Sequence, residues 1–159
     1  LIPPVLILSI AQRLVRTFCP DGAKETPIGP SERKRIEAQL SSLPEKYRFK
    51  IPDHVYEAVR TPTCPTGLRG RMAVFEVLGM SSEIERIVLD NPVDSRIWAA
   101  ARAQGMLTMQ EDAMMKAFDK HVPFSEVNTL STILSAGDTE TADTDTKPDA
   151  KVSAEPEKE

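Results

Sequence analysis

The chain has 159 residues, of which 40% are hydrophobic, and a formal net charge of -4. Its two cysteines are too few for a secreted disulfide framework, and its apolar start, residues 1–11, is far shorter than the roughly 20 residues of a membrane-spanning helix. Acidic charge is concentrated in residues 137–159, which hold eight acids and three lysines, so the rest is nearly neutral. Charge alone therefore does not make the body a polyanion binder.

Residues 1–18 are predicted to form an amphipathic helix. Pro3 and Pro4 suit a first helical turn, and the apolar residues that follow recur with a period of 3.6. These apolar residues are Ile7, Ile10, Ala11, Leu14, Val15 and Phe18. A run of turns is expected over residues 19–30, after which Ser31 fits the N-cap of a charged helix that ends by Pro44.

Extended structure is expected in the middle of the chain. Residues 47–51 alternate aromatic or apolar side chains with basic ones, which is the period of a half-buried strand or an extended arm. Residues 55–59 form a second apolar piece, either a strand or a single helical turn. The glycines at positions 67 and 70 predict a sharp bend, and residues 72–78 predict a short buried strand.

Helices are predicted from residue 81 to residue 135. Ser82 with Glu85 and Thr108 with Glu111 have the spacing of a capping box, in which each side chain satisfies a backbone N–H of the first turn. Gly105 suits the position after a helix end. Core positions are expected for Trp98 and for a stripe of methionines, namely Met109, Met114 and Met115. After residue 135 no apolar periodicity remains, and an acidic disordered tail is expected.

Chemical motifs are scarce. The chain lacks a G-x-x-x-x-G-K-[ST] loop, so no nucleotide cradle is expected in it. His54 and His121 stand apart from any carboxylate or cysteine pattern and are interpreted as ordinary surface or cap residues. Arg69 and Arg71 flank a glycine, where they could meet an anion but are more simply a solvated turn.

Cys19 and Cys64 each lie in a turn that contains proline, as the paired thiolates of zinc ribbons do. The C-x-x-C partner positions hold Gly22 and Thr61, so the two thiolates supply half of a tetrahedral ligand set and zinc is not expected. A disulfide is the alternative, but a reducing cytosol opposes it, and free, partly buried thiols are the expected state.

Several motifs in order together resemble the C-terminal third of the type II secretion and type IV pilus assembly ATPases. They are residues 11–16 (AQRLVR), Cys19-Pro20, Cys64 with residues 66–71 (TGLRGR), residues 75–78 (FEVL), and residues 103–106 (AQGM) with Thr108, Glu111 and Asp112. The order and spacing match over residues 1–134. The chain departs from the family pattern at Gly22 and Thr61, at Leu68 in place of a tyrosine, and by one residue fewer between Cys64 and Thr66.

The resemblance implies a mainly α fold with a short β element. Its implied parts are the terminal helix of the ATPase domain at 1–18, a degenerate tetracysteine-type subdomain at 19–70, a strand with a helical C-terminal region at 71–135, and the acidic tail at 136–159. Cys19 and Cys64 are then remnants of a zinc site. The first residue is Leu1 and the Walker motifs are expected upstream of it, so we expect a fragment that is inactive alone, with no catalytic residue assigned.

For the longer protein of which the chain would be a fragment, the resemblance implies ATP and Mg²⁺ as cofactors. It also implies a cytoplasmic homo-hexamer peripheral to the inner membrane. That motor would act with inner-membrane platform components to assemble pilin or pseudopilin, for secretion, pilus extension or DNA uptake. Two alternatives remain open. One is a nucleic-acid-binding protein that uses Arg13, Arg16, Arg48, Lys50, Arg69 and Arg71. The other is a thiol redox protein, against which the lack of a C-x-x-C pair argues.

Overall fold

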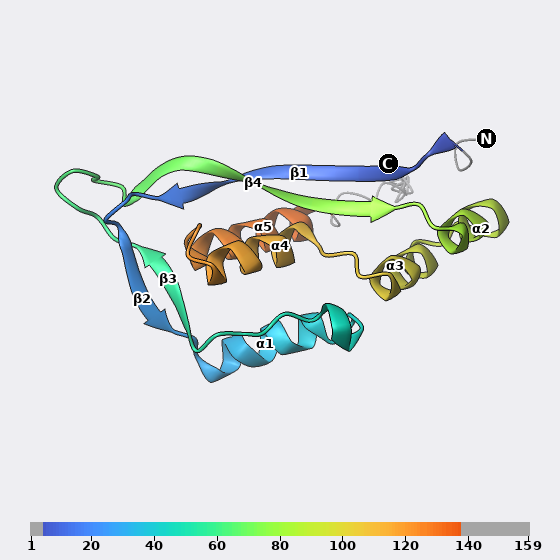
Figure 1. Ribbon diagram of the computed structural model, residues 1–159, viewed down its shortest axis with the longest axis horizontal. Coiled ribbons are helices and arrows are strands. Elements are labelled where there is room, and N and C mark those ends of the chain that lie inside the picture. The colour runs from blue at the N-terminus through green and yellow to red at the C-terminus, as the bar shows by residue number, and fades with distance from the viewer. Residues whose placement is uncertain (1–4, 138–159) are drawn as a thin grey trace, which may run out of the picture.

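The computed structural model describes residues 5–137. Its longest elements are two strands, β1 (Leu8–Phe18) and β4 (Leu68–Gly79), which form an antiparallel ribbon. The register runs from Leu8 opposite Gly79 to Arg16 opposite Arg71, and it shifts before Phe18. Figure 1 shows this ribbon along one side of the molecule, with α4 and α5 beneath it and α1 on the far side of those helices.

The prediction of a helix over residues 1–18 was wrong for the part that the structure describes. Residues 8–18 are strand β1, because β4 offers a matched partner along nearly the whole of it. The apolar run satisfies a period of 2 as well as one of 3.6, so periodicity could not choose between them. The pairing, which joins residues about 60 positions apart, decides the structure.

Residues 19–64 form an arm at one end of the ribbon. Strands β2 (Ala23–Pro27) and β3 (His54–Ala58) pair antiparallel, and between them lie α1 (Pro30–Leu40) and the 3-10 turn η2 (Glu45–Tyr47). Of the two alternatives for residues 55–59, a strand or a single helical turn, the structure has the strand, shifted by one residue as β3. Residues 47–51 do not form a strand. After η2 ends at Tyr47 the chain continues without regular structure, and Phe49 and Ile51 pack against the core without a partner strand. Helix α1 starts from Gly29 and Pro30 and not from Ser31.

Four helices follow the ribbon: α2 (Ser82–Asp90), α3 (Asp94–Ala103), α4 (Met109–Phe118) and α5 (Phe124–Gly137). The capping box of Thr108 and Glu111 is confirmed at α4. At α2 the cap is Ser81, whose hydroxyl accepts from the Ile84 N–H, and the pairing predicted for Ser82 is not formed. Gly105 has φ +92°, as a residue after a helix end requires.

The core has two clusters. The larger lies between the ribbon, α1, α4 and α5, and the smaller lies between α2 and α3. Met114 is buried and Met109 packs against the core as predicted, but Met115 is 36% exposed and was wrongly placed in the core. Trp98 is 44% exposed, so its expected role as a core anchor was also wrong. It lies on α3, where its ring is left partly open to solvent.

The fold class was predicted in part. The described residues contain five α-helices together with two two-stranded antiparallel sheets, so the β content exceeds the single short element that was expected. The helical region after residue 81 is confirmed. Of the predicted tail, residues 136 and 137 complete α5, and residues 138–159 lie outside the described part.

Candidate functional site

The two faces of the ribbon differ in what covers them. Side chains at odd positions of β1 and even positions of β4 face the helices, and Val15 and Val74 are buried there. The opposite face carries large apolar side chains that remain exposed. These are Leu8 (45%), Ile10 (57%), Leu14 (56%), Phe75 (40%) and Val77 (43%), which we call the outer apolar face. Clustered exposure of this kind marks an interaction surface.

The cross-strand register gathers this face into one patch. Ile10 pairs with Val77, Leu14 pairs with Ala73, and Phe75 stands opposite Gln12. Directly opposed residues on one face of an antiparallel pair have Cβ atoms about 5 Å apart, and diagonal neighbours about 7 to 8 Å apart are within reach of an aromatic ring such as that of Phe75. The exposed residues therefore form a continuous strip along the ribbon.

The ribbon is attached to α5 through Arg16. The Arg16 guanidinium donates to Glu126 Oε1 at 3.0 and 2.8 Å, and the Arg16 backbone N–H donates to Glu126 Oε2 at 2.9 Å. The hydrogen bond to the Glu126 carboxylate, and then its charge, raise the pKa of Arg16 above the usual arginine value. Glu126 was not singled out in the sequence, and its place in the first turn of α5 was the only available signal.

The ribbon is attached to α4 and α3 as well. Asp112 Oδ2 accepts from the Phe75 N–H at 2.8 Å and also pairs with Lys116 one turn along α4. The Gln104 amide donates to the Gly79 carbonyl at 2.8 Å. With Arg16, these contacts attach the ribbon to three helices along its length.

Cys19 and Cys64 come together at the base of the arm. The structure joins them in a disulfide with a Cα–Cα distance of 6.6 Å, so the expectation of free thiols was wrong. Hydrogen bonds of the flanking turns hold both ends, from Cys19 N–H to Gly67 O and between Thr61 and Cys64 in both directions. The Thr61 to Cys64 turn thus places the second sulfur beside the first.

The turns around this disulfide are tightly packed at Gly22. A Cβ on Gly22 would lie 3.0 Å from the Gly67 carbonyl oxygen and 3.2 Å from Cys19 Cβ. Among the described residues, no group of three His, Cys, Asp or Glu side chains could hold a metal ion. The degenerate tetracysteine-type insertion is therefore an arm closed by a disulfide, and the assignment of its cysteines as former zinc ligands stays a prediction.

The strand-to-helix junctions of residues 5–137 differ from a nucleotide-binding loop. Two strands of the described part lead directly into helices, β2 through Ile28-Gly29 and β4 through Met80-Ser81. Neither junction has the glycine-rich loop with lysine that cradles phosphates. No catalytic step with ATP is therefore derived from these residues.

The six basic residues of the nucleic-acid alternative are divided between two places. Arg13, Arg16, Arg69 and Arg71 belong to the ribbon, and Arg48 and Lys50 follow η2. Two of them already have partners, since Arg16 binds Glu126 and Arg48 donates to the Leu43 and Ser41 carbonyls. In Figure 1 the ribbon and η2 lie on opposite sides of α4, so these residues do not form one binding surface.

A family model described as "Type II/IV secretion system protein" matches residues 2–129. The chain belongs to this family. It is 32% identical to type II secretion system protein E of Xanthomonas campestris over 118 residues, which are 74% of this chain and 20% of that protein. It is 27% identical to the type IV pilus assembly ATPase PilB of Acinetobacter baylyi over 125 residues, 78% of this chain and 21% of PilB. The chain thus spans about a fifth of the length of these relatives.

Two of the motifs that resemble the family pattern lie in the ribbon. The AQRLVR motif lies in β1, and the TGLRGR motif forms the bend into β4 and its first residues. Gly67 and Gly70 have φ of +72° and +88°, and a Cβ on Gly67 would lie 2.7 Å from the Val59 carbonyl oxygen. Both motifs therefore build the ribbon and its junction with the arm. No helix of residues 5–137 is long and apolar enough to cross a membrane.

Proposed function

We propose that this chain is the C-terminal part of a hexameric secretion or pilus assembly ATPase, and that it supports and couples the motor without binding ATP. The motor would use ATP hydrolysis to assemble pilin or pseudopilin. Membership in the type II/IV secretion system protein family supports the motor, as do relatives named as type IV pilus assembly ATPases. The misfit between the described residues and a nucleotide cradle supports a role other than catalysis.

The main support for this proposal is the outer apolar face. Ile10 and Leu14 are more than half exposed, and Val77 is 43% exposed in the facing strand. Burying a whole side chain of this kind stabilises by roughly 1.5 to 3 kcal/mol, so covering the exposed half contributes about 1 kcal/mol for each residue. A strip of five such residues supports a stable contact with the nucleotide-binding part of the motor.

The attachments of the ribbon to the helices support the coupling role. Glu126, Asp112 and Gln104 tie the strands to α5, α4 and α3. A displacement of the outer apolar face would therefore move the helices with it as one body, which is how packed elements transmit rigid-body changes. The nucleotide-binding part would push on the ribbon, and the helical region would carry the movement to a partner.

The partners of such a motor would be its own copies in a homo-hexamer and the platform components of the inner membrane. The protein would be cytoplasmic and peripheral to that membrane. No direct contact with nucleic acid is proposed, because the basic residues are divided between the ribbon and the segment that follows η2. Zinc is not proposed either, and ATP and Mg²⁺ would belong to the nucleotide-binding part.

A chimera tests this function. The 125 matching residues of Acinetobacter baylyi PilB would be replaced by the corresponding residues of this chain, and ATP hydrolysis and hexamer formation would be measured. The expected result is a hexameric chimera that hydrolyses ATP. Ile10→Asp with Val77→Asp, on the outer apolar face, should reduce the rate at least about tenfold, equivalent to about 1.4 kcal/mol.

Leu89→Asp with Val93→Asp is the matched control, because both residues are exposed apolar residues away from the ribbon, at 64% and 41%. It should leave the rate and the hexamer unchanged. An inactive chimera that still forms hexamers would contradict the coupling role. Equal losses in both double variants would show that the outer apolar face is not the contact.

A further inference from the structure

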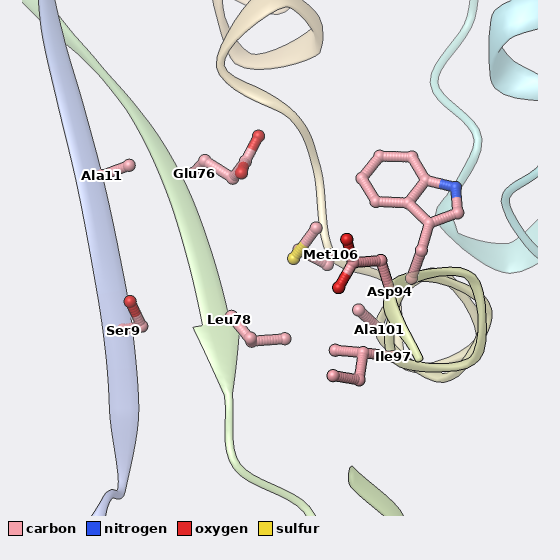
Figure 2. Close-up of a pocket in the computed structure, with 9 residues that line it drawn as sticks. Ser9, Ala11, Glu76, Leu78, Asp94, Ile97, Ala101 and Met106 are labelled. Carbon is pink, nitrogen blue, oxygen red and sulfur yellow. The ribbon is translucent and has the colours of Figure 1, made fainter. Parts of the chain in front are cut away.

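A groove of about 260 Å³ runs between the inner face of the ribbon and α3. Figure 2 shows Glu76 and Leu78 pointing from β4 toward Asp94, Ile97 and Met106 on the other side. Trp98 also lines it. The groove is on the helix side of the ribbon and is therefore separate from the outer apolar face.

The groove is acidic without a matching cation. Glu76 is half-buried and Asp94 is exposed, and neither has an ion pair or a side-chain hydrogen bond within residues 5–137. Arg13 lies on the same face, two residues from the Ala11 that pairs with Glu76, yet it forms no ion pair in that part of the chain. The two carboxylates thus favour a cation from outside.

Trp98 forms a fixed aromatic wall beside these carboxylates. The Arg102 guanidinium lies over its ring at 5.4 Å from the centroid. Arg102 is itself held by Glu111 at 2.6 and 2.7 Å and by the Ser42 hydroxyl. Rigid, partly exposed tryptophan is enriched among the residues that dominate binding energy at protein interfaces.

The size and charge of the groove narrow the ligand class. Small-molecule and cofactor sites generally have about 300 to 1,000 Å³, so this groove is suited to one or two side chains. Its carboxylates would repel the phosphates of a nucleotide or a nucleic acid. Leu78, Ile97 and Met106 provide an apolar wall for the methylene groups of a long side chain.

We propose that this groove binds a lysine or arginine side chain, with an adjacent apolar residue, presented by a partner protein. The cationic group would lie between Glu76 and Asp94, where the edge and free face of Trp98 add a cation–π contribution. The apolar neighbour would pack on Leu78 and Met106. This inference does not depend on the proposed motor function, since it concerns only the groove and its own partner.

Trp98 is the sole tryptophan of the chain, so intrinsic fluorescence reports the groove directly. The probe is the capped peptide Ala-Leu-Arg-Leu-Ala, and the comparison peptide has Glu in place of Arg. The Arg peptide should change the fluorescence saturably, with a Kd of about 0.1 to 1 mM. The affinity should fall several-fold between about 50 and about 500 mM salt, because the carboxylates are accessible to solvent. The Glu peptide should give no saturable change.

The double variant Glu76→Gln with Asp94→Asn removes both charges while keeping the side-chain shapes. This double variant should weaken the affinity for the Arg peptide at least about tenfold. Glu83→Gln with Asp119→Asn removes two exposed acids elsewhere and should leave the affinity unchanged. Binding of neither peptide, equal binding of both, or equal loss in the two double variants would overturn the proposal. Thermal unfolding of each variant verifies that the fold is retained.

Discussion

Arg102 and Glu111 form an ion pair with two hydrogen bonds inside the protein, with side chains 3% and 0% exposed. The pair joins α3 to the first turn of α4. Glu111 also accepts from the Thr108 N–H, and Arg102 also donates to the Met106 carbonyl and to Ser42 beyond α1. One buried pair thus connects the consecutive helices α3 and α4 with Ser42, which lies 60 positions from Arg102 in the sequence.

Removing one partner of this pair should be strongly destabilising. Glu111→Ala would leave the Arg102 charge buried without its partner, and we expect a loss of about 3 to 5 kcal/mol in the free energy of unfolding. Urea denaturation measures it. The double variant Arg102→Met with Glu111→Leu should recover most of that loss, because no unpaired charge remains. A loss below about 1 kcal/mol for Glu111→Ala would contradict a buried pair.

Replacing Glu126 should lower the free energy of unfolding more than replacing its partner Arg16. Arg16→Ala keeps the backbone hydrogen bond to Glu126 and removes a guanidinium that is 61% exposed, so it should cost at most about 1 kcal/mol. Glu126→Ala also leaves the Arg16 N–H without its acceptor and should cost about 1 to 3 kcal/mol. Chemical denaturation of the two single variants gives the comparison. A larger loss in the free energy of unfolding for Arg16→Ala than for Glu126→Ala would contradict this prediction.

The same pair gives a prediction about pH. The pKa of Arg16 is raised by its hydrogen bond with Glu126, so its contribution is fully present below the unfolded-state pKa and is lost only as pH rises through the folded-state pKa. Both values lie far above the neutral range. The difference in stability between wild type and Arg16→Lys, followed by thermal unfolding, should stay constant from about pH 7 to about pH 9. A difference that changes across this interval would assign the pH dependence to another group.

The sequence predicted the features that depend on neighbouring residues. The capping box of Thr108 and Glu111, the left-handed Gly105 and the bend at Gly67 are local, and all three are present. The β1 strand and the exposed Trp98 were missed, since both depend on distant partners. In β1, Ile10 and Leu14 fit the helical stripe, and only the register with β4 places both on the outer apolar face.

The candidate site was less predictable for the same reason. Cys19 and Cys64 stand out as residues, but only the folded arm shows that their turns meet. Glu76 and Asp94 give no signal as a pair, because the groove between them is created by the packing of α3 against the ribbon. The family resemblance identified the family correctly. The outer apolar face and the groove could be recognised only in the structure.

Reduction of the disulfide should loosen the arm. Closing a loop between residues 45 positions apart contributes about 4 kcal/mol in the loop-entropy model, so a reductant should lower the unfolding temperature measurably. Cys19→Ser with Cys64→Ser should unfold at the reduced temperature and show no response to reductant. An equal unfolding temperature with and without reductant in the unmodified protein would show that the cross-link adds nothing.

Gly67 should be the least replaceable glycine of the junction between the arm and the ribbon. Its φ of +72° disfavours any side chain by about 1 to 2 kcal/mol, and an added Cβ would lie 2.7 Å from the Val59 carbonyl oxygen. We expect Gly67→Ala to lose about 2 kcal/mol or more in the free energy of unfolding, measured in urea. Gly29→Ala is the matched control, because Gly29 has φ -68° and an added Cβ meets nothing within 4 Å. Equal stability of the two variants would mean that the bend into β4 does not need the left-handed conformation, and the junction would then owe its shape to the disulfide and the hydrogen bonds of the flanking turns.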